Sequence, residues 1–225
     1  MSVLSQTLVI AGKDMRIEWR GRARTAAIVG FAGTVLLLFS FAASADAKAL
    51  ATHAGGYFWL ALLLGSVLSL SDAFRVETED DALDGLLLLP VDPRAIFLGK
   101  ALARTAALAL LALFLMPIAS LLYGVGVDGS WLSLVAFIVL GVAGLAAPGT
   151  LYSAMTSQVR GREVLLPLLL FPLVVPVVLA VVKGTALALT GDPMNQAPSW
   201  LGVLVVFDLV YWSVCPLVFS AVVER

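Results

Sequence analysis

The residues that most often carry out catalysis or bind metals are scarce in this sequence. It contains one cysteine, Cys215, and one histidine, His53, so it cannot form an internal disulfide, a CxxC redox pair or a Cys/His zinc cluster. The two Gly-Lys pairs, at 12–13 and 99–100, are followed by Asp and Ala, so neither completes a phosphate-binding loop. Catalysis by a thiol or a protein-bound metal therefore loses most of the residues that it uses, and the chain cannot hydrolyse ATP by itself.

Carboxylates are the reactive groups with an unusual pattern. Residues 77–84 carry five acids in eight positions, a density that no hydrophobic core requires. Such a run is typical of either a solvated loop or a contact surface for a partner. Asp208 instead lies nine residues beyond Ser199 in an otherwise uncharged run, where a charge is costly unless it is paired or hydrated. We expect Asp208 to face protein or a water-filled cavity, in either a functional or a structural role.

The chain that positions these groups has the composition of a membrane protein. Of its 225 residues, 61% are hydrophobic and only 13% are charged, which excludes an ordinary soluble enzyme. A helix needs about 20 mostly apolar residues to cross the hydrocarbon layer. These runs are apolar on every side rather than alternating, which favours an all-α protein over a β-barrel. The six predicted spans are residues 25–45, 54–71, 105–127, 131–155, 164–182 and 199–223.

The distribution of positive charge predicts the orientation, because Lys and Arg are retained on the cytoplasmic side. Of the 14 Lys and Arg residues, 12 lie on one side of the six-span topology, and only Lys48 and Lys183 lie on the other. Both termini should therefore be cytoplasmic. A cleaved signal peptide ending at 43–45 is the alternative, but its apolar run is too long. The net charge of -1 provides no basic field for nucleic acid.

We divide the chain into an interfacial helix, residues 1–22, and a six-helix transmembrane domain, residues 23–225. In the first region, apolar residues recur every three or four positions, which predicts an amphipathic elbow helix along the membrane surface. This helix either anchors the chain or supports a partner at that surface. The apolar positions are Leu4, Leu8, Ala11, Met15 and Trp19.

Residues 75–98, between the second and third spans, are predicted to form a cytoplasmic coupling segment. Its acids are followed by four leucines and Pro90, and then by Asp92 and Pro93, which suit an N-cap and a first helical turn. We expect an acidic helix, a sharp corner and a new helix that leads into the third span. A cytosolic partner could push on this coupling segment and so tilt the second and third spans together.

Proline within the spans marks a second group of candidates. Each proline removes a backbone donor, which is tolerated only where neighbours satisfy the freed carbonyl. Pro167, Pro172 and Pro176 all lie in the fifth span, which should be bent or broken, and Pro148 lies in the fourth. Interrupted helices mark moving or substrate-contacting segments in transporters, so these prolines and Asp208 are intramembrane functional candidates. The general enrichment of proline in membrane helices is the alternative.

Small residues give the fourth span one face with little side-chain bulk. Gly141, Gly144 and Pro148 lie along one side, and Gly149 comes next. Such faces let another helix approach closely. We therefore predict that this face packs against neighbouring helices.

Two blocks of sequence, in the same order, resemble segments of one known family. The first is FRVETED at 74–80, followed by LD at 83–84 and LLLLP at 86–90; the second is APG at 147–149 and the proline-rich run at 165–176. These blocks resemble the haem exporter protein B family (CcmB), the membrane subunit of the cytochrome c maturation ABC transporter. The chain departs from the family at 81–82, where Gly-Thr is usual, and at Asp84, where Glu is usual.

The resemblance implies an ABC-2 type permease-like fold in the bacterial inner membrane, with the chain forming a homodimer within a larger complex. Its partners would be a cytosolic P-loop ATPase (CcmA-like), a haem-handling membrane protein (CcmC-like), a small helical subunit (CcmD-like) and a periplasmic haem chaperone (CcmE-like). ATP and Mg²⁺ would bind to the ATPase, the complex would handle haem, and this chain would bind no cofactor directly. The residues implied in ATPase coupling are Phe74, Arg75, Glu77, Glu79, Asp80, Asp84 and Pro90, together with Asp92 and Pro93.

In this reading, the chain is a permease subunit that couples ATP hydrolysis to haem delivery or to release of the haem-loaded chaperone. Three alternatives stay open. The chain could be an ABC-2 type permease that exports a lipid, drug or glycan, or a scaffold that transports nothing. It could also be an intramembrane enzyme that uses Asp208, although no HExxH or GxSxG motif is present to support that chemistry.

Overall fold

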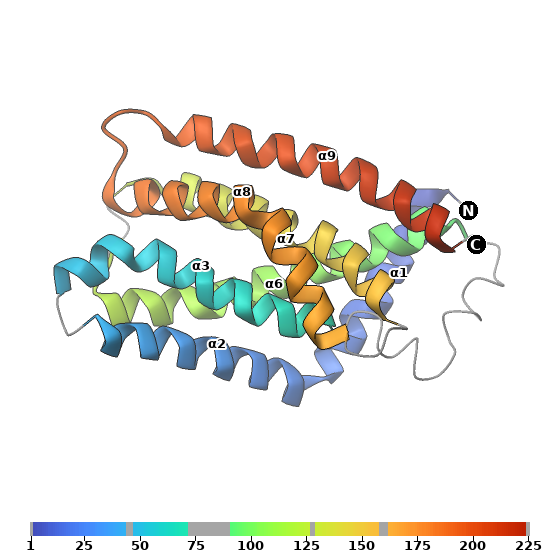
Figure 1. The fold of residues 1–225 in the computed structure, drawn as a ribbon, viewed down its shortest axis with the longest axis horizontal. Helices are drawn as coiled ribbons and strands as arrows, with labels where there is room; N and C mark the ends of the chain where they lie inside the picture. The colour runs from blue at the N-terminus through green and yellow to red at the C-terminus, as the bar shows by residue number, and fades with distance from the viewer. Residues whose placement is uncertain (1, 44–46, 72–90, 127–128, 158–161, 224–225) are drawn as a thin grey trace.

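The structure is a computed structural model that describes residues 2–43, 47–71, 91–126, 129–157 and 162–223. Six of its helices are long and apolar enough to cross a membrane. This confirms the predicted helical, six-span architecture for the ranges described. The start of α1 and the end of α9 lie at the same end of the bundle (Figure 1). The helices are α1 Val3–Arg20, α2 Arg22–Ala42, α3 Ala47–Ser71, α6 Pro93–Tyr123, α7 Trp131–Thr156, α8 Arg162–Thr190 and α9 Ala197–Val223.

Several helices continue beyond the uncharged runs that predicted them. Helix α6 begins at Pro93, well before the predicted span at 105–127, and α8 continues through Lys183 to Thr190. A charged side chain on a helix surface leaves the backbone hydrogen bonds intact, so charge limits the membrane-embedded part and not the helix itself. Helix α6 therefore extends beyond its apolar part by about three turns.

The predicted start of α6 is confirmed. The Asp92 carboxylate oxygen Oδ1 accepts a hydrogen bond from the Arg94 backbone N–H at 2.8 Å, and Pro93 occupies the first helical turn. A separate helix is also present in the predicted interfacial region, because α1 ends at Arg20 and α2 begins at Arg22; its position along a membrane surface stays a prediction. Between them, the Gly21 N–H donates to the carbonyls of Ile17 and Glu18 at 3.0 Å, which closes the last turn of α1.

Helix α7 lies among α3, α6, α8 and α9 and contacts all four. Its glycines make room for large side chains of these neighbours. A Cβ atom at Gly141 would lie 2.3 Å from the Trp59 ring, and one at Gly149 would lie 2.4 Å from Leu70. The Trp59 ring is held in place because its Nε1–H donates to the Thr185 hydroxyl of α8 at 2.8 Å. The prediction that the small-residue face of this span serves helix packing is confirmed.

The prolines of the fifth predicted span bend α8 without breaking it. Helix α8 is continuous from Arg162 to Thr190, and Figure 1 shows that it changes direction along its length. A break, the other predicted outcome, does not occur, because each proline removes one donor while its fixed φ stays helical. Pro172 and Pro176 are exposed on the outside of the bundle, whereas Pro148 of α7 is buried.

The tight packing at Gly141 predicts a large effect of a single methyl group. We expect Gly141→Ala to lower the free energy of unfolding by about 2 kcal/mol, because the methyl group overlaps the Trp59 ring. The matched control is Gly202→Ala, whose Cβ would meet nothing within 4 Å. Denaturant unfolding in detergent micelles measures both. Equal stabilities of the two variants would contradict the packing described here.

Candidate coupling site at the start of α6

The structure describes only part of the predicted ATPase-coupling set. Phe74, Arg75, Glu77, Glu79, Asp80, Asp84 and Pro90 lie outside the described residues. Asp92 and Pro93 are described, at the first turn of α6. What the structure contributes is therefore the arrangement of the two flanks of the coupling segment, namely the end of α3 and the start of α6.

The start of α6 is joined to α1 along a polar seam. The Gln6 side-chain oxygen accepts a hydrogen bond from the Asp92 backbone N–H at 3.3 Å. Further along, Lys100 Nζ lies 3.1 Å from Asp14 Oδ2, and Arg104 Nη1 lies 2.9 Å from Glu18 Oε2. Partners in all three contacts are 86 positions apart in the sequence. A constant separation means that the two helices run parallel and stay in register.

Close approach of these two helices depends on Gly99. A Cβ atom at this position would lie 2.7 Å from the Ile10 side chain and 3.0 Å from the Thr7 carbonyl. On another face, the start of α6 packs against α9, where the rings of Phe97 and Phe219 have centroids 5.6 Å apart. Buried Cys215 belongs to the same apolar cluster. The start of α6 is thus enclosed by α1 on one side and α9 on another.

The ion pairs of the seam are largely withdrawn from solvent. The Lys100 and Asp14 side chains are 2% and 5% exposed, and those of Arg104 and Glu18 are 9% and 17% exposed. Lys13 Nζ also lies 3.6 Å from Asp14 Oδ1. Removing a charge from water costs several kcal/mol, which a close partner offsets. Each charged group of the seam therefore depends on its partner to stay buried.

Arg104 extends the seam to a third helix. Besides its ion pair with Glu18, its Nη1 donates to the Ser69 backbone carbonyl of α3 at 3.4 Å. Helix α3 ends before the coupling segment, and α6 begins at Pro93, within the last residues of that segment. Both flanks of the segment are therefore joined to each other and to α1 through one guanidinium group. We call Asp14, Glu18, Ser69, Lys100 and Arg104 the junction.

Sequence reasoning did not predict the junction. It identified the apolar side of α1, and the structure leaves Leu4, Leu8 and Trp19 of that side 74%, 65% and 68% exposed, as suits a face turned toward lipid. The seam to α6 uses other positions of the helix. One signal was available: the acids at 14 and 18 have the same four-residue spacing as the cations at 100 and 104, and this spacing aligns side chains on one helix face.

Asp208 lies on α9 and faces the protein, as expected. Its Oδ1 lies 3.1 Å from where a Cβ atom of Gly144 would be, beside Val177 of α8. Both carboxylate oxygens are buried, and neither has a hydrogen-bond partner among the residues that the structure describes. Within the ranges described, no group of three or more His, Cys, Asp and Glu residues could hold a metal ion. A role for Asp208 stays a prediction.

These features define a multi-pass helical membrane protein in which the most acidic part of the sequence lies between α3 and α6, two helices that are joined to each other. A sequence model of the family described as "CcmB protein" matches residues 5–225. The chain belongs to this family, which confirms the resemblance carried by its two sequence blocks.

Curated relatives match this chain over most of their own length. Heme exporter protein B of Pseudomonas aeruginosa is 27% identical over 201 residues, covering 89% of this chain and 90% of the relative. The protein of the same name from Paracoccus denitrificans is 33% identical over 188 residues, with coverages of 81% and 84%. That from Rhodobacter capsulatus is 30% identical over 167 residues, with coverages of 74% and 76%.

The buried pair between α1 and α6 predicts a large cost for removing one partner. We expect Lys100→Met to lower the free energy of unfolding by about 3 kcal/mol, because Asp14 would lose its closest cation while it stays buried. Adding Asp14→Leu should recover most of the loss, since no unpaired charge is then left. Unfolding in detergent micelles measures both variants. Arg16→Met, at an exposed position of α1, is the control. A loss in Lys100→Met no larger than the control's would refute a stabilising role of the pair.

Proposed function

We propose that this chain is the membrane-spanning permease subunit of an ABC transporter complex for haem export and cytochrome c biogenesis. The observation that carries this proposal is the family match over residues 5–225, on a chain with six helices able to cross a membrane. The relatives' name, heme exporter protein B, supports haem as the species that the complex handles. The sequence contains no phosphate-binding loop, so a partner must supply ATP hydrolysis.

The proposed complex contains a cytosolic CcmA-like ATPase, CcmC-like and CcmD-like membrane subunits, and a periplasmic CcmE-like chaperone. Two copies of the chain would pair over two ATPase subunits in the bacterial inner membrane, with both termini cytoplasmic. Hydrolysis by the ATPase would drive haem delivery or the release of the haem-loaded chaperone. The positions of the positive residues and the even number of spans support this orientation.

The junction suggests how force would enter the membrane. An ATPase that presses on the acids of the coupling segment would act between α3 and α6, and Arg104 joins the end of α3 to α6 about three turns after α6 begins. Helix α6 is 31 residues long without interruption, or about 46 Å at the helical rise. Its one internal proline, Pro117, lies late in the helix, so a displacement at Asp92 would be carried along a single uninterrupted helix at least to that position. Because α1 is paired with α6 in register, it must move with it.

The same contacts carry the movement to α9. Phe97 of α6 packs on Phe219 near the end of α9, and α7 contacts both helices. The moving unit we propose consists of α1, α3, α6 and the adjoining end of α9. In this mechanism the chain acts as a lever, and its chemistry is limited to holding charged groups together at low dielectric.

The proposed orientation predicts which ends of the bundle accept a membrane-impermeant thiol reagent. In a Cys215→Ser background, Met194→Cys in the exposed loop before α9 should be labelled by a charged maleimide in spheroplasts. Ser2→Cys, at the opposite end, should be labelled only after permeabilisation. Gel mobility or mass spectrometry measures the labelling. The reverse pattern would place the coupling segment outside the cell and exclude contact with a cytosolic ATPase.

Charge reversal tests the coupling segment directly. We expect the combined variant Glu79→Lys, Asp80→Lys and Asp84→Lys to insert normally but to lose the co-purifying ATPase, because the acids that form the proposed contact become repulsive. A haem-stained gel should then lack c-type cytochromes. The matched control, Asp46→Lys, changes an acid between the first and second spans and should retain both partner and cytochromes.

Deletion of the chain, an ATPase that cannot hydrolyse ATP, and the triple variant together separate the alternatives. Normal cytochromes after deletion of the whole chain would favour export of a lipid, drug or glycan. Cytochromes that depend on the chain but not on a hydrolysis-competent ATPase would favour a scaffold. Full activity and unchanged co-purification of the triple variant would contradict the proposed contact.

A further inference from the structure

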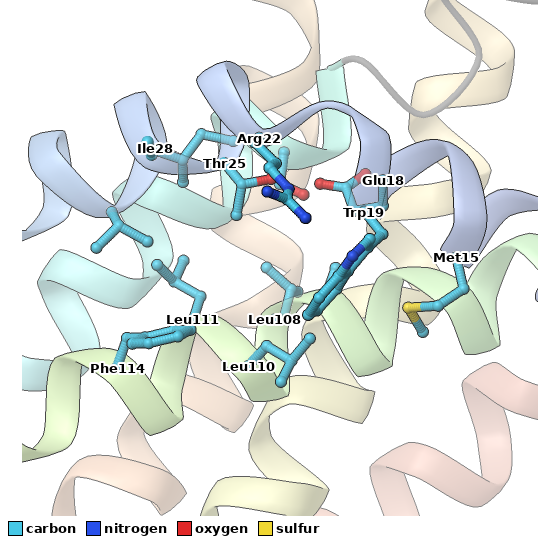
Figure 2. Close-up of a pocket in the computed structure, with 14 residues that line it drawn as sticks. Met15, Glu18, Trp19, Arg22, Thr25, Ile28, Leu108, Leu110, Leu111 and Phe114 are labelled. Atoms are coloured by element: carbon cyan, nitrogen blue, oxygen red, sulfur yellow. The ribbon is translucent and has the colours of Figure 1, made fainter.

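A pocket of about 440 Å³ lies under the elbow between α1 and α2, apart from the coupling segment. Figure 2 shows its arrangement: Arg22 and Trp19 point from the elbow toward α6, and Leu110, Leu111 and Phe114 form the opposite wall. Trp19, Leu110 and Phe114 are all exposed. The pocket therefore opens onto the outer surface of the bundle, where membrane lipid would contact it.

The lining of the pocket is divided between a polar end and an apolar end. Its polar members, Glu18, Arg22, Thr25 and Ser69, lie at the elbow and at the end of α3. From Ala107 to Phe114, the wall formed by α6 is apolar over about 10 Å at the helical rise. A ligand that fits such a pocket has a polar head and a hydrocarbon chain.

The position of the pocket along the bundle also favours a ligand with a polar head and a hydrocarbon chain. No charged residue follows Arg104 in α6 or Arg24 in α2, so the hydrocarbon layer should begin just beyond these residues. The polar end of the pocket lies at this boundary and the apolar end lies beyond it. A membrane lipid that keeps its headgroup at the interface would place its acyl chain against Leu111 and Phe114.

Charge selects the type of headgroup. The pocket's one acid, Glu18, is neutralised by Arg104 at 2.9 Å, and Asp14 is paired with Lys100. Arg22 is exposed, and within the residues described it has neither an ion pair nor a hydrogen-bond partner. Arg16 and Arg20 are also exposed nearby on α1. Because both acids of α1 are paired within the junction, the outer side of the elbow has an excess of positive charge.

We propose that this pocket binds one anionic phospholipid, with the phosphate at Arg22 and one acyl chain between α2 and α6. Basic pockets between membrane helices at the headgroup level are known to take acidic lipids. The bound lipid would fill the space between the elbow and α6 and so brace the junction on its lipid-facing side. The proposal does not depend on haem handling or on the ATPase.

Native mass spectrometry of the full chain in mild detergent tests this proposal. The protein is offered an equimolar mixture of dioleoylphosphatidylglycerol and dioleoylphosphatidylcholine, which share acyl chains but differ in net charge. We expect one retained phosphatidylglycerol. Arg22→Ala should weaken its binding about fivefold, as expected for the loss of one cation at an anionic lipid surface. Arg16→Ala, which removes the same charge at an exposed position outside the pocket, should retain the lipid.

A second variant tests the acyl-chain part of the pocket. Ala26 lines the pocket and is exposed, so Ala26→Trp should fill the space and abolish lipid retention while the lipid-free protein keeps its thermal stability. Equal retention of the two lipids, or equal losses in Arg22→Ala and Arg16→Ala, would overturn the proposal. So would a wild-type dimer that Ala26→Trp converts to monomer, because the occupant would then be a second copy of the chain.

Discussion

Two buried ion pairs between α1 and α6 hold together the end of the molecule where its charges are concentrated. Lys100 and Arg104 belong to the part of α6 that precedes its apolar region, and neither could be buried without Asp14 and Glu18. The pairing turns a surface helix into part of the bundle. It also determines which charges remain on the outside, because the acids of α1 are used internally while its arginines face outward.

The rest of the bundle is held by a different kind of force. In lipid, apolar side chains gain little from leaving the hydrocarbon, so helix association depends on close packing. Helix α7 achieves this with glycines that accept Trp59 and Leu70 from α3 and Val177 from α8. The α1–α6 seam is thus held largely by charge, whereas the packing around α7 depends on shape. This division places the polar contacts next to the coupling segment, which is where a movable connection to a partner is needed.

The proposed function rests on the family assignment and on the junction. The family assignment supports a subunit that is driven by a partner, and the junction joins the two helices that flank the most acidic segment of the chain. The contacts between the end of α3 and the first part of α6 explain how a push on the coupling segment could move several helices together. Contact of the acids themselves with an ATPase stays a prediction, since those residues lie outside the described ranges. The Asp208 carboxylate, which has no hydrogen-bond partner within the described ranges, has no part in this mechanism.

The sequence by itself determined the number and order of the spans, a separate helix before the first span and the start of α6 at Asp92. Each of these follows from local rules: a helix is the way for a single apolar segment to satisfy its backbone in lipid, and caps act within one turn. Only the tertiary structure decided that Asp14 pairs with Lys100 and that Gly144 faces Asp208. Helical periodicity places residues on a face of their own helix, but the partner of that face depends on how all the helices pack together.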